Sequence, residues 1–184
     1  MPTASRWSTA TIWLHWLSAL VIIGLLALGW IMVHAVDDSA EKFDLYQWHK
    51  SFGFVALALL LARIVARLAS AAPAALAMPA WELRAANAMH WTLYGLTLVA
   101  TLSGWLLASA AVIPIPSRFF NLFVIPNIAG SDPALAGQMT LLHYLATRLM
   151  MALVALHIAA ALKHHFIDRD DALRRILPRW RTPG

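Results

Sequence analysis

LLHYLATRLMMALVALHIAAALKHHF, residues 141–166, is an almost unbroken apolar stretch that ends in a basic cluster. A helix that rises 1.5 Å per residue needs about 20 apolar residues to cross a hydrocarbon core of about 30 Å. The stretch meets that length and predicts a membrane-spanning helix. It also contains His143 and His157, and an ionisable side chain inside a membrane span is by default a candidate functional residue.

Three other apolar stretches precede this one. The four predicted spans cover about residues 13–36, 46–68, 87–112 and 141–166. Of the 184 residues, 61% are hydrophobic and only 12% are charged, whereas about 25% of the residues in soluble domains are charged. We therefore predict an all-α integral membrane four-helix bundle that forms a single domain over residues 1–184. Four spans place both termini on one side of the membrane.

Basic residues are divided unevenly between the two ends of the predicted bundle. The opposite end from the termini has an acidic connection, and the cations there are Lys42, Lys50 and Arg118. The end with the termini has Arg6, Arg63, Arg67, Arg84, Lys163, Arg169, Arg174, Arg175, Arg179 and Arg181. The positive-inside rule then predicts cytoplasmic termini. Membrane orientation also accounts for the net charge of +5, so we expect no nucleic-acid partner.

The chain contains no cysteine. This excludes disulfide frameworks, thiolate metal sites, iron–sulfur ligation and covalent haem attachment through a CxxCH motif. Any bound metal must therefore be held by histidine, methionine or carboxylate side chains.

The depths of four histidines sort them into two pairs. His143 and His157 are 14 residues apart, so they share one helix face at levels separated by about 21 Å. His15 lies at the start of the first span, whereas His49 lies near the start of the second, on the opposite side. Because the fourth span runs back again, His143 reaches the level of His49 and His157 that of His15.

Two imidazoles from neighbouring helices suit a six-coordinate haem iron, which exchanges electrons because both axial positions are filled. We therefore predict two b-type haems, with His15 and His157 as iron ligands on the cytoplasmic side. His49 and His143 are the predicted ligands on the periplasmic side.

The same 14-residue step identifies further candidate haem-binding residues. It leads from His15 to Gly29, whose missing side chain would let the periplasmic haem approach the backbone. From His49 it leads to Arg63, which could bind a propionate of the cytoplasmic haem. Gly53, one turn after His49, offers similar room.

Three other residues carry weaker predictions. His164 lies two turns beyond His157, where a quinone would need a proton donor, although a histidine at a helix end also complements the helix dipole. The charge of Arg148 inside the fourth span is energetically unfavourable. Its side chain therefore either pairs with a haem propionate or extends toward the membrane interface. His90 begins the third span and is either an interfacial residue or a neighbour of a haem ligand.

The motifs IWLHW around His15, YQWHKSFG around His49, LARIVARL after it, LLHY around His143 and ALHIAAALKHHF around His157 resemble the bacterial cytochrome b561 family. The resemblance covers essentially the whole chain and extends to the b-subunits of nickel hydrogenases and formate dehydrogenases. It implies the same two ligand pairs, a quinone near the cytoplasmic haem and a location in the bacterial inner membrane.

Members of this family include superoxide oxidases, so the resemblance implies electron transfer from periplasmic superoxide to ubiquinone as a candidate reaction. Lys50 and Arg148, together with Lys42 and Arg118, are then the cations available to attract the anionic donor. The alternative is a membrane anchor that passes electrons between a soluble redox partner protein and quinone. A non-haem di-iron enzyme is a third interpretation, but the HxxxH and HxxHH clusters typical of that class are absent.

Overall fold

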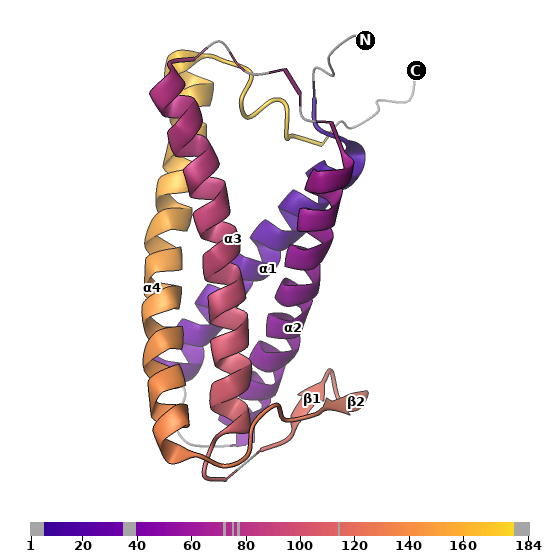
Figure 1. The fold of residues 1–184 in the computed structure, drawn as a ribbon, viewed down its shortest axis with the longest axis vertical. Coiled ribbons are helices and arrows are strands. Elements are labelled where there is room, and N and C mark those ends of the chain that lie inside the picture. The colour runs from indigo at the N-terminus through magenta and orange to yellow at the C-terminus, as the bar shows by residue number, and fades with distance from the viewer. Residues whose placement is uncertain are drawn as a thin grey trace.

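The computed structural model of the chain describes residues 6–34, 40–71, 73–74, 76, 78–113 and 115–178. Four long helices dominate it: α1 (Thr9–His34), α2 (Ala40–Ala69), α3 (Ala80–Ser109) and α4 (Pro133–Lys163) (Figure 1). Two short strands, β1 (Ser117–Phe119) and β2 (Phe123–Ile125), lie between α3 and α4, and a π-helical turn, η1 (His164–Asp168), follows α4. All four long helices are long and apolar enough to cross a membrane. The predicted four-helix membrane bundle is confirmed.

The helix boundaries differ from those predicted. Each helix begins 4 to 8 residues before its predicted span, and α1, α3 and α4 end 2 to 3 residues before theirs. The early starts arise because a helix continues beyond the hydrocarbon into the polar interface, where hydropathy no longer marks it. The start of α4 has a local cause: the Asp132 side chain accepts hydrogen bonds from the amides of Ala134 and Leu135, and Pro133 occupies the first turn.

The helices pack as two pairs, α1 with α2 and α3 with α4, and α2 also contacts α3. Many of the buried positions are small, among them Ser18, Ala56, Ser103 and Ala146. Small residues let helix backbones approach closely in membranes, where packing rather than hydrophobic burial drives association. Large apolar side chains such as Leu61, Val65 and Leu68 remain exposed, as expected of surfaces that face lipid.

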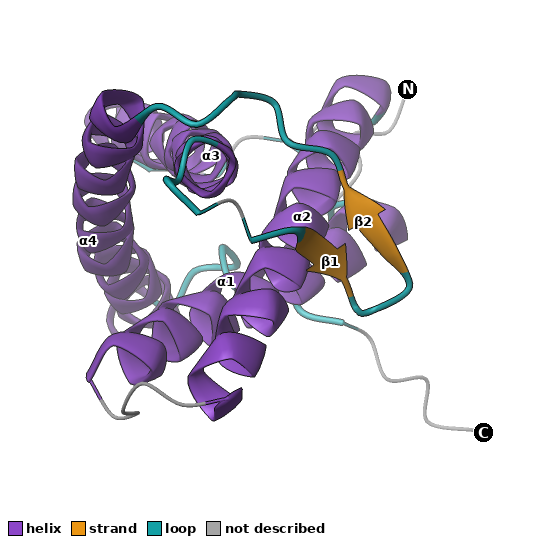
Figure 2. Ribbon diagram, turned by 90° about the horizontal axis from the view of Figure 1, so that it is seen from below, coloured by secondary structure: helices purple, strands orange, loops and turns teal. Residues whose placement is uncertain are grey.

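A β-hairpin lies against α2 at one end of the bundle, which we call the hairpin end (Figure 2). Its strands are antiparallel, with Ser117 opposite Ile125, and its turn uses the positive φ angles of Phe120 and Asn121. The Gln47 side chain on α2 accepts a hydrogen bond from the Arg118 amide and donates one to the Pro116 carbonyl. The hairpin thus supplies hydrogen-bond partners for a polar side chain of α2, which lipid could not do.

The first helix begins and the fourth ends at the opposite end, which we call the terminal end (Figure 1). After η1, Arg169 adopts a left-handed conformation with φ of 54° and turns the chain back. The Trp16 indole donates a 2.8 Å hydrogen bond to the Ile176 carbonyl, and Arg175 donates to Ala74. The C-terminal segment therefore packs across the terminal end. Asp37, Asp38, Arg179 and Arg181 of the charge pattern lie outside the described residues.

Candidate functional site

The hairpin end brings together His49 from α2 and His143 from α4. Their ring centres are 6.2 Å apart and the ring planes are inclined by 78°. His143 Nδ1 lies 2.8 Å from the Ala100 carbonyl oxygen on α3. Because a carbonyl only accepts, Nδ1 carries the proton, and Nε2 keeps the lone pair that a metal needs. Donation from the second nitrogen to a carbonyl is usual for metal-binding histidines.

A cavity of about 430 Å³ adjoins this pair and is lined by both histidines. Gly53, Phe54, Thr97 and Gly104 also line it. A Cβ atom added at Gly53 would meet no atom within 4 Å, so this glycine leaves open space as predicted. The lining is largely apolar with a few polar groups, which is typical of a cofactor site.

Two glycines lie against the histidine rings at this end. A Cβ at Gly29 of α1 would come within 3.4 Å of His49 Cε1, and a Cβ at Gly104 of α3 within 3.2 Å of His143 Cε1. Gly29 therefore makes room for the ring of a candidate ligand, and its contact with a haem stays a prediction. The two helix pairs share this arrangement. In each pair, a histidine of one helix packs against a glycine of the other.

The terminal end brings together His15 from α1 and His157 from α4, with ring centres 6.3 Å apart at 62°. The Arg63 guanidinium from α2 donates a 3.2 Å hydrogen bond to His15 Nδ1 and lies 5.0 Å from the centre of the Tyr94 ring. Arg63 is therefore at the level predicted for it. The four candidate ligands form two pairs at the two depths that their spacing indicates.

His90 on α3 also belongs to the terminal end, because its ring centre is 5.5 Å from that of His157. We had left it out of the predicted site, as we had Gly104. One signal could have found both, since His90 and Gly104 are 14 residues apart, like His15 and Gly29. The step that we applied to the first and second spans holds in the third as well.

The spacing of the rings is a test of whether a metal fits. Two imidazoles that share one metal through bonds of about 2.0–2.1 Å have ring centres roughly 6 to 6.5 Å apart, since each nitrogen lies about 1.1 Å from its ring centre. The observed separations of 6.2 and 6.3 Å fall in this range. Both pairs therefore have room for an iron between the rings, and the hairpin end also has a cavity for a surrounding macrocycle.

The three remaining candidates, Lys50, Arg148 and His164, lie in three different places in the structure. Lys50 lines the histidine cavity and also an outer pocket with Lys42 and Tyr46. Its ammonium group donates a 3.3 Å hydrogen bond to the Ile115 carbonyl. Arg148 does not line the cavity and is exposed on the outside of α4. The structure therefore does not bring Arg148 to the predicted site.

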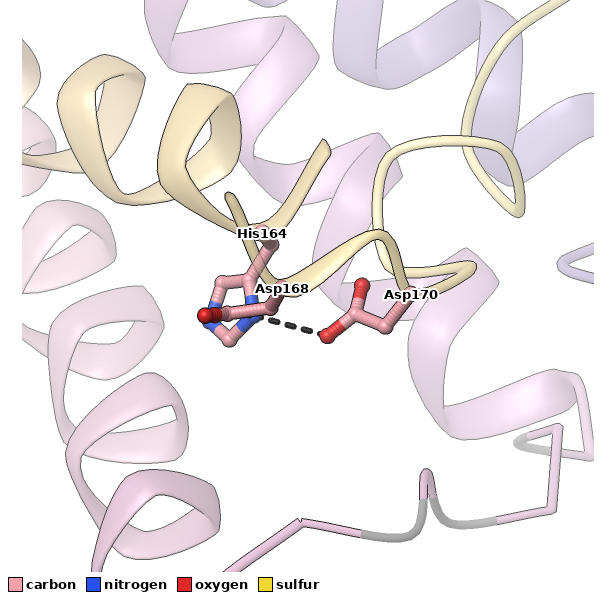
Figure 3. A group of neighbouring side chains, drawn as sticks. All are labelled: His164, Asp168 and Asp170. Carbon is pink, nitrogen blue, oxygen red and sulfur yellow. Dashed lines mark hydrogen bonds and ion pairs between the residues drawn. The ribbon is translucent and has the colours of Figure 1, made fainter. Parts of the chain in front are cut away.

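His164 lies at the terminal end in the π-helical turn (Figure 3). Its Nδ1 is 2.8 Å from a carboxylate oxygen of Asp170 and 3.2 Å from one of Asp168. Asp168 is also paired with Lys163. The left-handed Arg169 returns the chain so that the Asp170 amide donates to the His164 carbonyl. The turn thus holds two carboxylates around one imidazole.

Long apolar helices with paired histidines inside the bundle define a multi-pass membrane protein of the cytochrome type. A model of the prokaryotic cytochrome b561 family matches residues 6–179. The chain belongs to that family, whose members are b-type haem proteins, and it is accordingly a multi-pass protein of the bacterial inner membrane that acts in electron transfer.

Three curated relatives match along almost the whole chain. Cytochrome b561 homolog 2 of Escherichia coli is 34% identical over 95% of this chain and 93% of its own length. Cytochrome b561 homolog 1 of the same organism is 27% identical over 95% of this chain and 98% of its own. A probable superoxide oxidase, CybB of Yersinia pestis, is 24% identical over 96% and 98%.

The glycine beside His143 supports a first prediction. Gly104→Ala adds a Cβ that must displace the His143 ring and disturb its bond to Ala100, so we expect haem retention to weaken about ten-fold, as for other changes next to metal ligands. Haem per chain, measured after purification by the pyridine haemochrome method, checks this. Gly95→Ala is the matched control on the same helix, because a Cβ there meets nothing within 4 Å. Equal haem loss in both variants would contradict the assignment.

Proposed function

We propose that this chain transfers electrons through two b-type haems, from a donor at the hairpin end to ubiquinone at the terminal end. The observation that carries the proposal is the pair of cross-bundle histidine contacts at two depths, each with the spacing that one metal ion requires. Along α4 the two pairs are separated by 14 residues, or about 21 Å. Two haems at these levels would divide electron transfer across the hydrocarbon core into short steps.

His49 and His143 would hold one haem, and His15 and His157 the other. A haem held by two histidines would supply a one-electron carrier. His143 is prepared for ligation through Nε2 by its bond to Ala100. His15 differs, because arginine has only donors and Arg63 therefore requires Nδ1 of His15 to accept. For His15 to hold an iron through Nε2 with Nδ1 protonated, Arg63 would have to turn away from His15, and its guanidinium could then bind a haem propionate.

The terminal end is proposed to face the cytoplasm. Among the described residues, eight arginines and lysines lie at or beyond this end: Arg6, Arg63, Arg67, Arg84, Lys163, Arg169, Arg174 and Arg175. Lys42, Lys50 and Arg118 lie at the hairpin end. The positive-inside rule assigns the richer end to the cytoplasm, which leaves the hairpin end for the periplasm.

Superoxide is the leading candidate donor. A relative named as a probable superoxide oxidase matches nearly the full chain. Lys50 lines both the outer pocket and the histidine cavity, so its positive charge lies between solution and the proposed haem. Two superoxide anions would each give up one electron and leave as dioxygen, and one ubiquinone would take up two electrons and two protons to become ubiquinol.

His164 is the proposed proton donor to the reduced quinone. Its Nδ1 faces Asp170 and Asp168, which leaves Nε2 to hand over a proton. A carboxylate behind an imidazole fixes the orientation of the ring. The cytoplasmic location of this turn would allow reprotonation from water.

The alternative function is that of a membrane anchor for a soluble redox subunit. The hairpin favours it, because Leu122, Phe123 and Val124 are exposed there and form an apolar surface that a subunit could cover. In that case the proposed haems would accept electrons only in the complex, and the isolated chain would not be reduced by superoxide. A stoichiometric partner in membranes of the native host would accompany this result.

Replacement of one ligand tests the two-haem arrangement. We expect two haems per wild-type chain and one in His49→Ala, because each haem has its own pair of ligands. The remaining haem should still be reduced by ubiquinol. His34→Ala is the control, since His34 lies at the same end and its ring bonds the Trp30 carbonyl of its own helix. One haem in the wild-type chain, or loss of both in His49→Ala, would contradict the model.

The donor can be tested through Lys50. Superoxide should reduce the purified chain, and Lys50→Gln should slow this reaction about two- to five-fold at low ionic strength, with a smaller difference at high salt because surface charges are screened. Stopped-flow absorbance of the haem α-band measures the rate. Arg118→Gln removes a cation from the same end outside the pocket lining and should have less effect. An unreactive wild-type chain would exclude superoxide as the donor.

The quinone end can be tested separately. His164→Gln should slow reoxidation of the prereduced chain by a soluble ubiquinone about 100-fold, as for loss of a general acid. Asp170→Asn should slow it about ten-fold, and neither change should alter the haem content. The control is Asp171→Asn, because Asp171 is paired with Arg174 rather than with His164. Unchanged reoxidation in His164→Gln would remove this histidine from the mechanism.

A further inference from the structure

Arg148 is the one charged residue within the apolar run of α4 between Leu141 and Leu162. It lies seven residues inside that run, or about 10 Å below its outer end. Its side chain is exposed on the surface of the bundle. A charged group at this depth is costly unless something compensates it.

The proposed haem cavity is not the compensating group. The face of α4 that looks into the bundle includes His143, Ala146, Thr147 and Met150, which are buried or line the cavity. Arg148 is five residues from His143, which places it about 140° around the helix. It is therefore on the outward face and does not point to the space between His49 and His143.

No carboxylate in the described part of the chain lies at the same depth. The nine acidic residues all lie at the ends of the predicted or observed helices or in the connections: Asp37, Asp38, Glu41, Asp44, Glu82, Asp132, Asp168, Asp170 and Asp171. A second copy with the same membrane orientation would bring its acids to the same levels. The described acidic residues of a homodimer would therefore not reach Arg148, and we expect the compensating anion to come from another molecule.

Tyr144 lies one turn from Arg148 toward the hairpin end, and the two side chains are in contact. The Arg148 guanidinium lies 5.0 Å from the centre of the Tyr144 ring, so the side chain extends toward that end of the helix, where headgroups lie. Tyr144 is 53% exposed, and Leu145 and Leu149, which lie deeper along α4, are 54% and 49% exposed. A guanidinium and a phenol above apolar side chains offer donors to a phosphate and a surface to its acyl chains.

We propose that Arg148 and Tyr144 form a binding site for the phosphate of an anionic phospholipid in the leaflet at the hairpin end. The guanidinium can bind two phosphate oxygens at once, and the Tyr144 hydroxyl can donate to a third. An anionic lipid is favoured over a zwitterionic one because a zwitterionic headgroup brings its own ammonium group. The site is independent of the proposed electron path.

The experiment uses the full chain in detergent, titrated with phosphatidylglycerol or phosphatidylcholine and analysed by native mass spectrometry. We expect the wild-type chain to retain phosphatidylglycerol in preference. Arg148→Gln should weaken its binding about ten-fold, the loss expected for a charge-assisted hydrogen-bonded contact, and Tyr144→Phe should weaken it less. The matched control is Arg118→Gln, which removes a cation from the same end outside the span and should bind as the wild type does.

Three results would overturn the proposal: equal retention of the two lipids by the wild-type chain, unchanged phosphatidylglycerol binding in Arg148→Gln, or a copurifying protein that is lost only in Arg148→Gln. If Arg148→Gln does not accumulate, Arg148→Lys is the test variant. Lysine keeps the charge but lacks the planar guanidinium that binds two oxygens at once. Weaker phosphatidylglycerol binding by Arg148→Lys supports the site, and unchanged binding overturns it. The haem α-band of each variant reports that the bundle is folded.

Discussion

The constraint on which the structure depends is that polar groups inside hydrocarbon must find partners within the protein. Hydroxyl groups inside the helices meet it locally: Ser18 donates to Leu14, Thr97 to Leu93 and Thr147 to His143, each across one turn of its own helix. The imidazole rings of His15 and His143 instead meet groups of neighbouring helices, the Arg63 guanidinium and the Ala100 carbonyl. They require a neighbouring helix or a ligand, and this requirement orders the interior of the bundle.

The histidines of α2 and α4 illustrate how that order arises. At the hairpin end each ring lies on a glycine of the adjacent helix, Gly29 for His49 and Gly104 for His143. Without a side chain on either glycine, the rings lie between the two helix pairs and face each other. At the terminal end Arg63 and His90 take part, so that pair is more polar and more crowded. This difference in surroundings is expected to separate the reduction potentials of the two proposed haems.

Much of this arrangement follows from spacing along the chain. The separation of His143 and His157 by 14 residues, and the opposite directions of successive spans, predicted which rings meet at which depth, and the structure brings those rings together. The same step predicted the level of Arg63. Gly104 follows the same pattern, since it lies 14 residues after His90. For Arg148 the spacing left two alternatives open, a haem propionate or the membrane interface, because depth alone does not specify which face of a helix a residue occupies.

The sequence by itself determined the number of spans, the depth of every histidine and the membrane-protein class, because hydropathy and a helical rise of 1.5 Å per residue depend only on local sequence. The tertiary structure decided which helices pair, that Gly29 faces a ring, that Arg148 faces outward and that Asp170 returns to His164. These features depend on the rotation of each helix about its axis and on the turns at Arg169 and the hairpin, which are set by contacts between distant residues. Such contacts have no counterpart in the periodicity of a single span.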